Sequence, residues 1–204
     1  GRSLYFFSGG KGQYLVKNKK MTAPSFDSFG WLWVAESDGA VRAYNAASTN
    51  EKERSKGIEI PVSWRSGMTF SSLRISHDGA RVVVVGTRDG TAAVVMSGVV
   101  RDSSGTPKGF TEPVRVTSSI TPRTAVWAGE QNLVVVNDKT GESEVTTLSG
   151  EETKFDRLDG VKSVSAAGNT SNMLAHRSDG SCYVLEERGW NRLNTSTREM
   201  SFAG

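Results

Sequence analysis

The stretch that decides the fold is SLRISHDGARVVVV at residues 72–85, which is soon followed by the pair Asp89-Gly90. It predicts a strand ending near Ile75, a short turn around Gly79, and a strand made of four consecutive valines. Continuous apolarity of that kind is typical of a strand buried on both faces. Asp-Gly after such a strand is a strong hairpin signal, because glycine adopts a positive φ without strain. The stretch therefore predicts three successive antiparallel strands.

The same order of elements recurs along the chain. The units that share it are 24–46, 71–100, 123–148 and 161–187. Their second turns align at Asp38-Gly39, Asp89-Gly90, Thr140-Gly141 and Asp179-Gly180, with glycine spacings of 51, 51 and 39 residues. The strands before these turns are the most apolar of each unit and run over 31–35, 81–85, 133–136 and 173–175. Since a four-stranded propeller blade repeats every ~40–45 residues, the spacing predicts an all-β fold, a β-propeller.

A fourth strand is expected at the outer edge of each blade. The segments are 58–64, 112–116, 154–158 and 190–193. Pro61 and Pro113 lack a backbone donor, which suits an edge strand and not a central one. The polar segments 45–57 and 101–111 are interpreted as long outer loops, and the charged run 51–54 as a solvated loop in preference to one helical turn.

Closure of the ring is expected from the two ends of the chain. Apolar segments at 4–7 and 13–16 flank a glycine-rich turn and predict a hairpin, to which 200–202 would add one strand. This gives four full blades plus an incomplete fifth blade, with a four-bladed ring or an open arc as alternatives. All 204 residues are expected to form one domain. With no initiator Met and no leader, that domain is interpreted as part of a longer protein.

Composition argues against several kinds of site and partner. The chain has 25 Lys and Arg against 22 Asp and Glu, a net charge of +3, with the two signs interspersed, so nucleic acid is not expected as a partner. The single cysteine, Cys182, allows neither an internal disulfide nor a cysteine-clustered zinc site. His77 and His176 lie in different units, so no metal or cofactor is expected. No run approaches the about 18 apolar residues of a membrane span.

The recurring turn carboxylates are the sharpest basis for an enzyme. Asp38, Asp89, Asp138 and Asp179 occupy equivalent places in the repeat, and in a ring they would lie on one face. Gathered carboxylates could bind calcium or hydrolyse a glycoside. Each aspartate is sufficiently explained by its turn, where a short polar side chain bonds its own backbone, and this interpretation is preferred. No catalytic residue is therefore assigned.

Tryptophans and basic residues are the candidates for contact with a partner. Most tryptophans, Trp31 and Trp33 included, are expected to pack between blades, but a surface-facing Trp64 or Trp190 would suit an interface. Basic side chains are expected to meet on one rim of the ring. They are Arg65, Arg88, Arg123, Lys139 and Arg177.

The deciding stretch also carries a family resemblance. Together with WLWVA at 31–35, GVVRD at 98–102 and VWAG at 126–129, it resembles the C-terminal propeller of the actinobacterial LpqB lipoprotein family over roughly 25–190. The resemblance implies an exported protein that is anchored to the cell membrane by a lipid upstream of this chain. It also implies a non-catalytic role beside the extracytoplasmic domain of a sensor histidine kinase, in two-component signalling and cell-envelope homeostasis. The alternatives are a propeller hydrolase or lyase, or a module binding sugar or peptide, acting on cell-envelope polymer.

Overall fold

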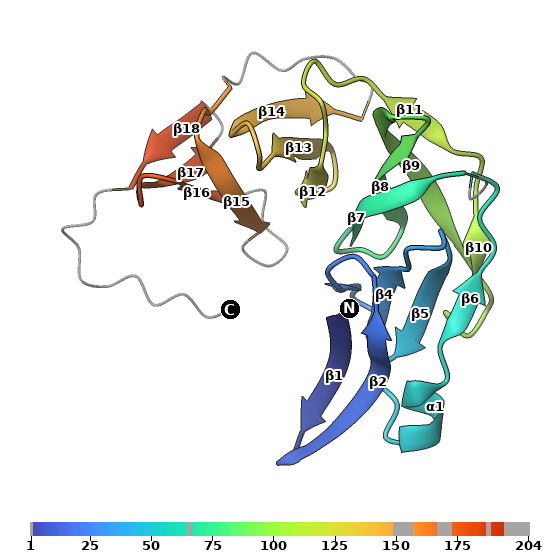
Figure 1. The fold of residues 1–204 in the computed structure, drawn as a ribbon. Helices are drawn as coiled ribbons and strands as arrows, with labels where there is room; N and C mark the ends of the chain where they lie inside the picture. Colours follow the sequence, from blue (N-terminus) through green and yellow to red (C-terminus); the bar gives the residue numbers. More distant parts are fainter. Residues whose placement is uncertain (1, 65–66, 149–156, 167–172, 187–188, 194–204) are drawn as a thin grey trace.

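The computed structural model describes residues 2–64, 67–148, 157–166, 173–186 and 189–193. Four antiparallel sheets follow one another along an arc, and a two-stranded hairpin lies beside the first of them (Figure 1). Within each sheet, strands that are consecutive in sequence pair with each other, as in the blades of a propeller, except that the last strand of the second sheet pairs with the third strand of that sheet. The all-β, blade-like organisation expected from the repeat is confirmed. In the described part of the chain the sheets do not close into a ring, and 200–202 lies outside it.

The hairpin and the first sheet contain the N-terminal strands. The hairpin consists of β1 (Arg2–Ser8) and β2 (Lys11–Lys19). The first sheet consists of β3 (Ser25–Phe26), β4 (Trp31–Ala35), β5 (Val41–Asn45) and β6 (Ile58–Ile60). Gly9 and Gly10 have φ values of +57° and +75°, so they form the tight hairpin turn that the glycine-rich segment predicts.

The other three sheets follow in sequence order. The second consists of β7 (Thr69–Ile75), β8 (Arg81–Arg88), β9 (Thr91–Arg101), β10 (Pro107–Phe110) and β11 (Val114–Val116). The third consists of β12 (Thr124–Ala128), β13 (Asn132–Asn137) and β14 (Glu142–Thr147). The fourth consists of β15 (Val161–Ala166), β16 (Met173–Arg177), β17 (Cys182–Glu186) and β18 (Gly189–Arg192).

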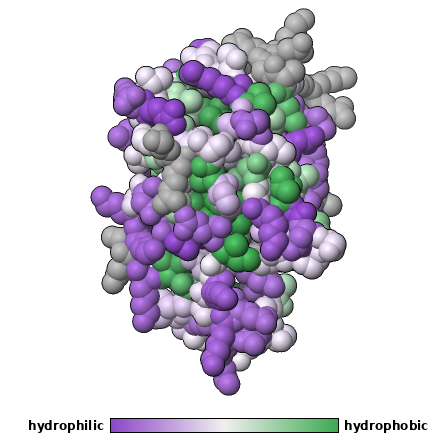
Figure 2. Space-filling model, turned by 90° about the vertical axis from the view of Figure 1, so that its right-hand side faces the viewer, coloured by the Kyte–Doolittle hydropathy of each residue, from purple (hydrophilic) through white to green (hydrophobic). Residues whose placement is uncertain are grey.

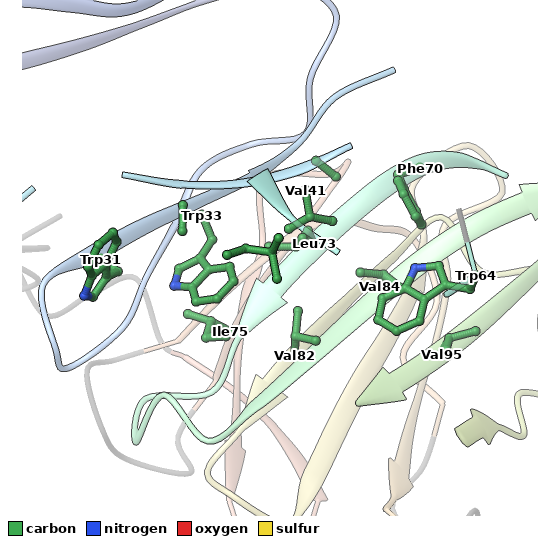
Figure 3. Close-up of a cluster of buried hydrophobic side chains, with 13 residues drawn as sticks. Trp31, Trp33, Val41, Trp64, Phe70, Leu73, Ile75, Val82, Val84 and Val95 are labelled. Atoms are coloured by element: carbon green, nitrogen blue, oxygen red, sulfur yellow. The ribbon is translucent and has the colours of Figure 1, made fainter. Parts of the chain in front are cut away.

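The core lies between neighbouring sheets, which explains the runs of apolar residues. In β8, Val82 and Val84 pack toward the first sheet, whereas Val83 and Val85 pack toward the third. Side chains alternate between the two faces of a strand, so a sheet between two others needs apolar residues at every position. The cluster between the first and second sheets includes Trp33, Leu73 and Ile75, which lie side by side in Figure 3.

Two segments differ from the sequence-based expectation. Strand β10 pairs with β9 inside 101–111, which the polar composition had indicated to be a loop. The charged run begins a short helix, α1 (Glu51–Ser55), capped by the Asn50 side chain, which accepts from the Lys52 amide. The interpretation of that run as a solvated loop is wrong, because a side-chain cap and acidic residues in the first turn favour the helix.

The outer strands agree in part with expectation. β6, β11 and β18 lie where edge strands are expected, with Pro61 directly after β6 and Pro113 directly before β11. Residues 154–156 lie outside the described chain, and the described residues 157–158 are not in a strand. The side of the molecule seen in Figure 2 is mainly hydrophilic, with smaller hydrophobic patches. Among the described residues, no helix is long and apolar enough to cross a membrane.

Candidate binding face

The four hairpin turns that follow β4, β8, β13 and β16 lie at one end of the sheets, and we call this end the turn face. Adjacent sheets are linked there: the Ser71 hydroxyl at the start of β7 donates to the backbone oxygen of Arg123, which precedes β12, at 2.6 Å. The amide of Val161, the first residue of β15, donates to the Gly141 oxygen at 3.0 Å. The sequence repeat therefore places equivalent turns on a common surface.

Each turn has the local chemistry that its aspartate predicts, with one exception. Asp89 and Gly90 have φ values of +49° and +77°, as a type I′ turn requires. The Asp38 carboxylate accepts from the Ala40 amide at 3.0 Å, and Asp179 accepts from the Ser181 amide at 2.9 Å. The Ser181 hydroxyl also donates to Asp179 and lowers the pKa of that carboxyl.

Asp138 is the exception, because another side chain caps its turn and its own carboxylate accepts from Arg123. Arg123 Nε lies 2.6 Å from Asp138 Oδ1. The turn is instead capped by Asn137, whose side-chain oxygen accepts from the amides of Lys139 and Thr140. A carboxylate-based enzyme on this face would need at least three of the turn aspartates to converge within metal-ligand distance. Over the described ranges, no three or more His, Cys, Asp or Glu side chains are placed to hold a metal ion.

The basic residues of the turn face are partly paired, so the face carries both signs of charge. Arg88 donates to the backbone oxygen of Trp64 at 3.0 Å, and Lys139 is exposed in its turn. Arg177 donates to the backbone oxygen of Asp159 at 2.7 Å and lies 3.5 Å from the Asp179 carboxylate. Together with the Arg123–Asp138 pair, these contacts replace the expected basic patch by a mixed one.

Three candidates remain, and the structure describes two of them. Arg65 lies outside the described residues. Trp64 is 7% exposed, so it does not meet the condition of a surface-facing ring on which its proposed role at an interface depends. The Phe110 ring of β10 covers it, with ring centroids 5.3 Å apart, and the sequence had not indicated that strand. Trp190 is half-buried and packs against the cluster between the third and fourth sheets.

The remaining tryptophans are equally withdrawn from solvent. Trp31, Trp33 and Trp127 are 8%, 0% and 6% exposed, and they pack between sheets as expected. Binding of sugar or peptide on exposed tryptophan rings therefore has no support from these residues.

The opposite end of the sheets carries features that the sequence analysis missed. Phe26 and Phe29 are 59% and 51% exposed there, and the Arg101 guanidinium lies over the Phe29 ring. Nearby, the Asp78 amide donates to Glu130 Oε1 at 3.3 Å across the second and third sheets. Burial and the charge of Asp78 raise the pKa of Glu130. Burial by itself would raise the pKa of Asp78, but hydrogen bonds to its carboxylate, above all from the Ser76 hydroxyl, outweigh burial. The pKa of Asp78 is therefore lowered.

The family of the chain follows from its similarity to known proteins. A model of the family described as the lipoprotein LpqB β-propeller domain matches residues 1–200. The chain belongs to the LpqB β-propeller family. The resemblance carried by the 72–85 stretch is thereby confirmed for this LpqB-type domain.

Individual relatives agree with that membership. Lipoprotein LpqB of Streptomyces avermitilis is 27% identical over 131 residues, which are 62% of this chain and 21% of that protein. The chain thus spans about a fifth of the length of this relative. Two solved structures share the fold of the LpqB-type domain. They are the C-terminal WD40 domain of Sif2 (TM-score 0.54, 14% identity, 94% of this chain and 52% of that one) and a streptogramin B lyase (TM-score 0.59, 9% identity, 96% and 63%).

Proposed function

We propose that this chain is a non-catalytic, extracytoplasmic protein-interaction module of a membrane-anchored lipoprotein. In this proposal the turn face contacts the extracytoplasmic domain of a sensor histidine kinase and so takes part in two-component signalling at the cell envelope. Membership of the LpqB β-propeller family supports the lipoprotein context. The four sheets, which lie along an arc, present this face.

The turn face is the observation that carries the proposal. Four turns from four sheets meet at one end, where Arg88 and Lys139 are exposed beside paired charges. Charges at the rim of an interface contribute to association rate and to partner discrimination more than to raw affinity. A face that carries both signs suits a partner with a complementary pattern, in preference to a polymer of one charge.

Direct binding to the purified kinase domain tests the proposal. The chain is captured on a surface and titrated with that domain, in calcium and then in a chelator, with an unrelated extracytoplasmic domain as the control. We expect saturable binding that the chelator does not change, because the contact needs no metal. Absence of binding at high micromolar concentration would exclude this chain as the contact module. Binding that the chelator abolishes would favour a metal-dependent function.

A further inference from the structure

A cavity of about 220 Å³ lies where the inner strands of three sheets approach one another. Its wall comes from β7, from the start of β12 and from the segment before β3. The residues that line it are Arg2, Ala23, Ser71, Ser72, Arg74, Arg123, Thr124 and Asp138. Three guanidinium groups and three hydroxyl groups therefore surround a space many times larger than one water requires.

The charge of the lining is unbalanced. Asp138 is the one acid among these lining residues, and Arg123 already pairs with it at 2.6 Å. Arg74 has no carboxylate partner among the described residues. Since Arg2 also lines the space, two cationic groups remain uncompensated, and the cavity favours a negatively charged occupant.

Arg74 has donors to spare. Its Nη1 group donates to the backbone oxygens of Ala23 at 3.2 Å and Leu73 at 3.1 Å. A guanidinium has five N–H donors, and within the described chain Nε and Nη2 have no acceptor. Burial lowers the pKa of Arg74, and an anion beside it would offset that desolvation. The two contacts to backbone oxygens fix the side chain in place.

Ser72 gives independent support. It is 4% exposed, and its hydroxyl oxygen is buried and has no hydrogen-bond partner among the residues that the structure describes. A buried polar group without a partner costs free energy, so its presence in the lining needs a reason. A ligand oxygen in the cavity would accept from this hydroxyl.

We infer that the cavity binds a phosphate-class oxyanion, held by Arg74 and Ser72 with Arg2 and Arg123 nearby. Guanidinium groups match the geometry of phosphoryl oxygens and bind them through parallel N–H donors. The phosphoryl group has two possible sources, a free phosphate ion or the phosphodiester of an envelope polymer. The cavity adjoins the proposed kinase-binding face and shares Arg123 and Asp138 with it, but the two groups assigned to hold the anion, Arg74 and Ser72, are separate from the exposed Arg88 and Lys139 of that face.

Calorimetric titration with inorganic phosphate tests the assignment. The 204-residue chain is titrated at constant ionic strength with chloride as the balancing anion, and then with dimethyl phosphate and with acetate. We expect saturable phosphate binding, and dimethyl phosphate reports whether a diester also fits. Lack of saturable binding up to about 10 mM phosphate would overturn the inference. That concentration corresponds to a favourable binding free energy of only about 3 kcal/mol. Acetate binding as tight as phosphate would overturn the phosphate assignment.

Matched variants separate the site from general screening. Arg74→Gln is expected to weaken phosphate binding about ten- to hundredfold, as for loss of a charged hydrogen-bonding group. Arg192→Gln removes the same charge from β18 in the fourth sheet and is expected to change affinity less than about twofold. Equal weakening in both variants would mean screening and would overturn the inference.

Ser72→Ala keeps the proposal testable should Arg74→Gln fail to fold. The hydroxyl has no partner in the structure, so its loss is expected to leave the thermal midpoint in chloride unchanged or raise it. Phosphate affinity is expected to fall about fivefold or more, because a donor to the anion is removed. Unchanged phosphate affinity in Ser72→Ala would contradict the assigned role of this residue and overturn the site as described.

Discussion

Replacing Asp27 by alanine removes a buried acceptor that links the first and second sheets at the end opposite the turn face. Its carboxylate is fully buried and accepts from Arg101 Nη2 at 2.6 Å and from Trp33 Nε1 at 2.8 Å. Its second oxygen accepts from the amides of Phe29 and Trp31, each at 2.9 Å. The Arg101 side chain is 11% exposed and would keep only the backbone oxygens of Gly105 and Gly79 as acceptors within the described chain. Asp27→Ala therefore leaves a largely buried charge without its carboxylate and removes the acceptor of the Trp33 indole N–H.

The expected loss follows from that burial. Breaking a buried pair by removing one partner costs about 3–5 kcal/mol. For a chain of this size each kcal/mol lowers the thermal midpoint by about 2–4 °C, so the midpoint should fall by about 6–20 °C. Urea denaturation followed by tryptophan fluorescence, together with calorimetry, measures the change.

A matched pair on the surface provides the control. Arg123 and Asp138 are also 2.6 Å apart, but their side chains are 38% and 47% exposed. Exposed pairs contribute about 0–1 kcal/mol, so Asp138→Ala should remain within that range. Equal losses in the two variants would refute the reasoning from burial. If Asp27→Ala does not fold, Asp27→Asn, which keeps an acceptor oxygen without the charge, should still lose more stability than Asp138→Ala.

Three further predictions concern a carboxyl pair, a turn and the core. Glu130→Gln should raise the thermal midpoint at pH 7, and the gain should shrink as the pH falls toward the ordinary carboxyl range. Burial and the charge of Asp78 raise the pKa of Glu130 in the folded protein. The folded state therefore loses stability as the pH rises through this raised pKa and the carboxyl ionises. A gain that does not change with pH would contradict this reasoning. Gly90→Ala should lower the free energy of unfolding in urea titrations by about 1–2 kcal/mol, because φ at this position is +77°. The control Gly109→Ala should leave it nearly unchanged, because an added Cβ there meets no atom within 4 Å. Equal losses in the two variants would count against a type I′ turn. Leu133→Ala, fully buried between the second and third sheets, should cost about 2–5 kcal/mol, and a loss below 1 kcal/mol would contradict that packing.

The blade repeat could be predicted from sequence because burial imposes a simple pattern. A strand that packs against a sheet on each side needs apolar residues throughout, and Val82 to Val85 and Leu133 to Val136 satisfy this. The hairpin turns could be located because positive φ restricts the residue type, as at Asp89-Gly90. Both signals are local, so one sequence suffices to read them.

Features that depend on contacts between distant segments could not be predicted in the same way. β10 is short and lies within a largely polar segment, and pairing with the long β9 is what makes it a strand. Because that strand was missed, the covering of Trp64 by Phe110 was missed too. The pairing of Arg123 with Asp138 required knowledge that β12 begins beside the turn of its own sheet.

The sequence around Arg74 gave only a weak indication of a binding site. Arg74 stands between Leu73 and Ile75 in a strand, where alternation permits a polar residue facing solvent. The structure instead turns that position toward a cavity shared by three sheets. The convergence of Arg2, Arg74 and Arg123 comes from parts of the chain that no local pattern relates.

Calorimetric titration of the kinase extracytoplasmic domain with two variants tests the role of the turn face most directly. One variant reverses its exposed charges, Arg88→Glu with Lys139→Glu, and the other, Phe26→Ser, removes an exposed aromatic ring from the opposite end of the sheets. We expect the charge reversal to weaken binding at least about tenfold and Phe26→Ser to change it less than about twofold. Loss of binding in Phe26→Ser with unchanged affinity in the charge-reversed variant would contradict the account and assign the partner to the opposite face.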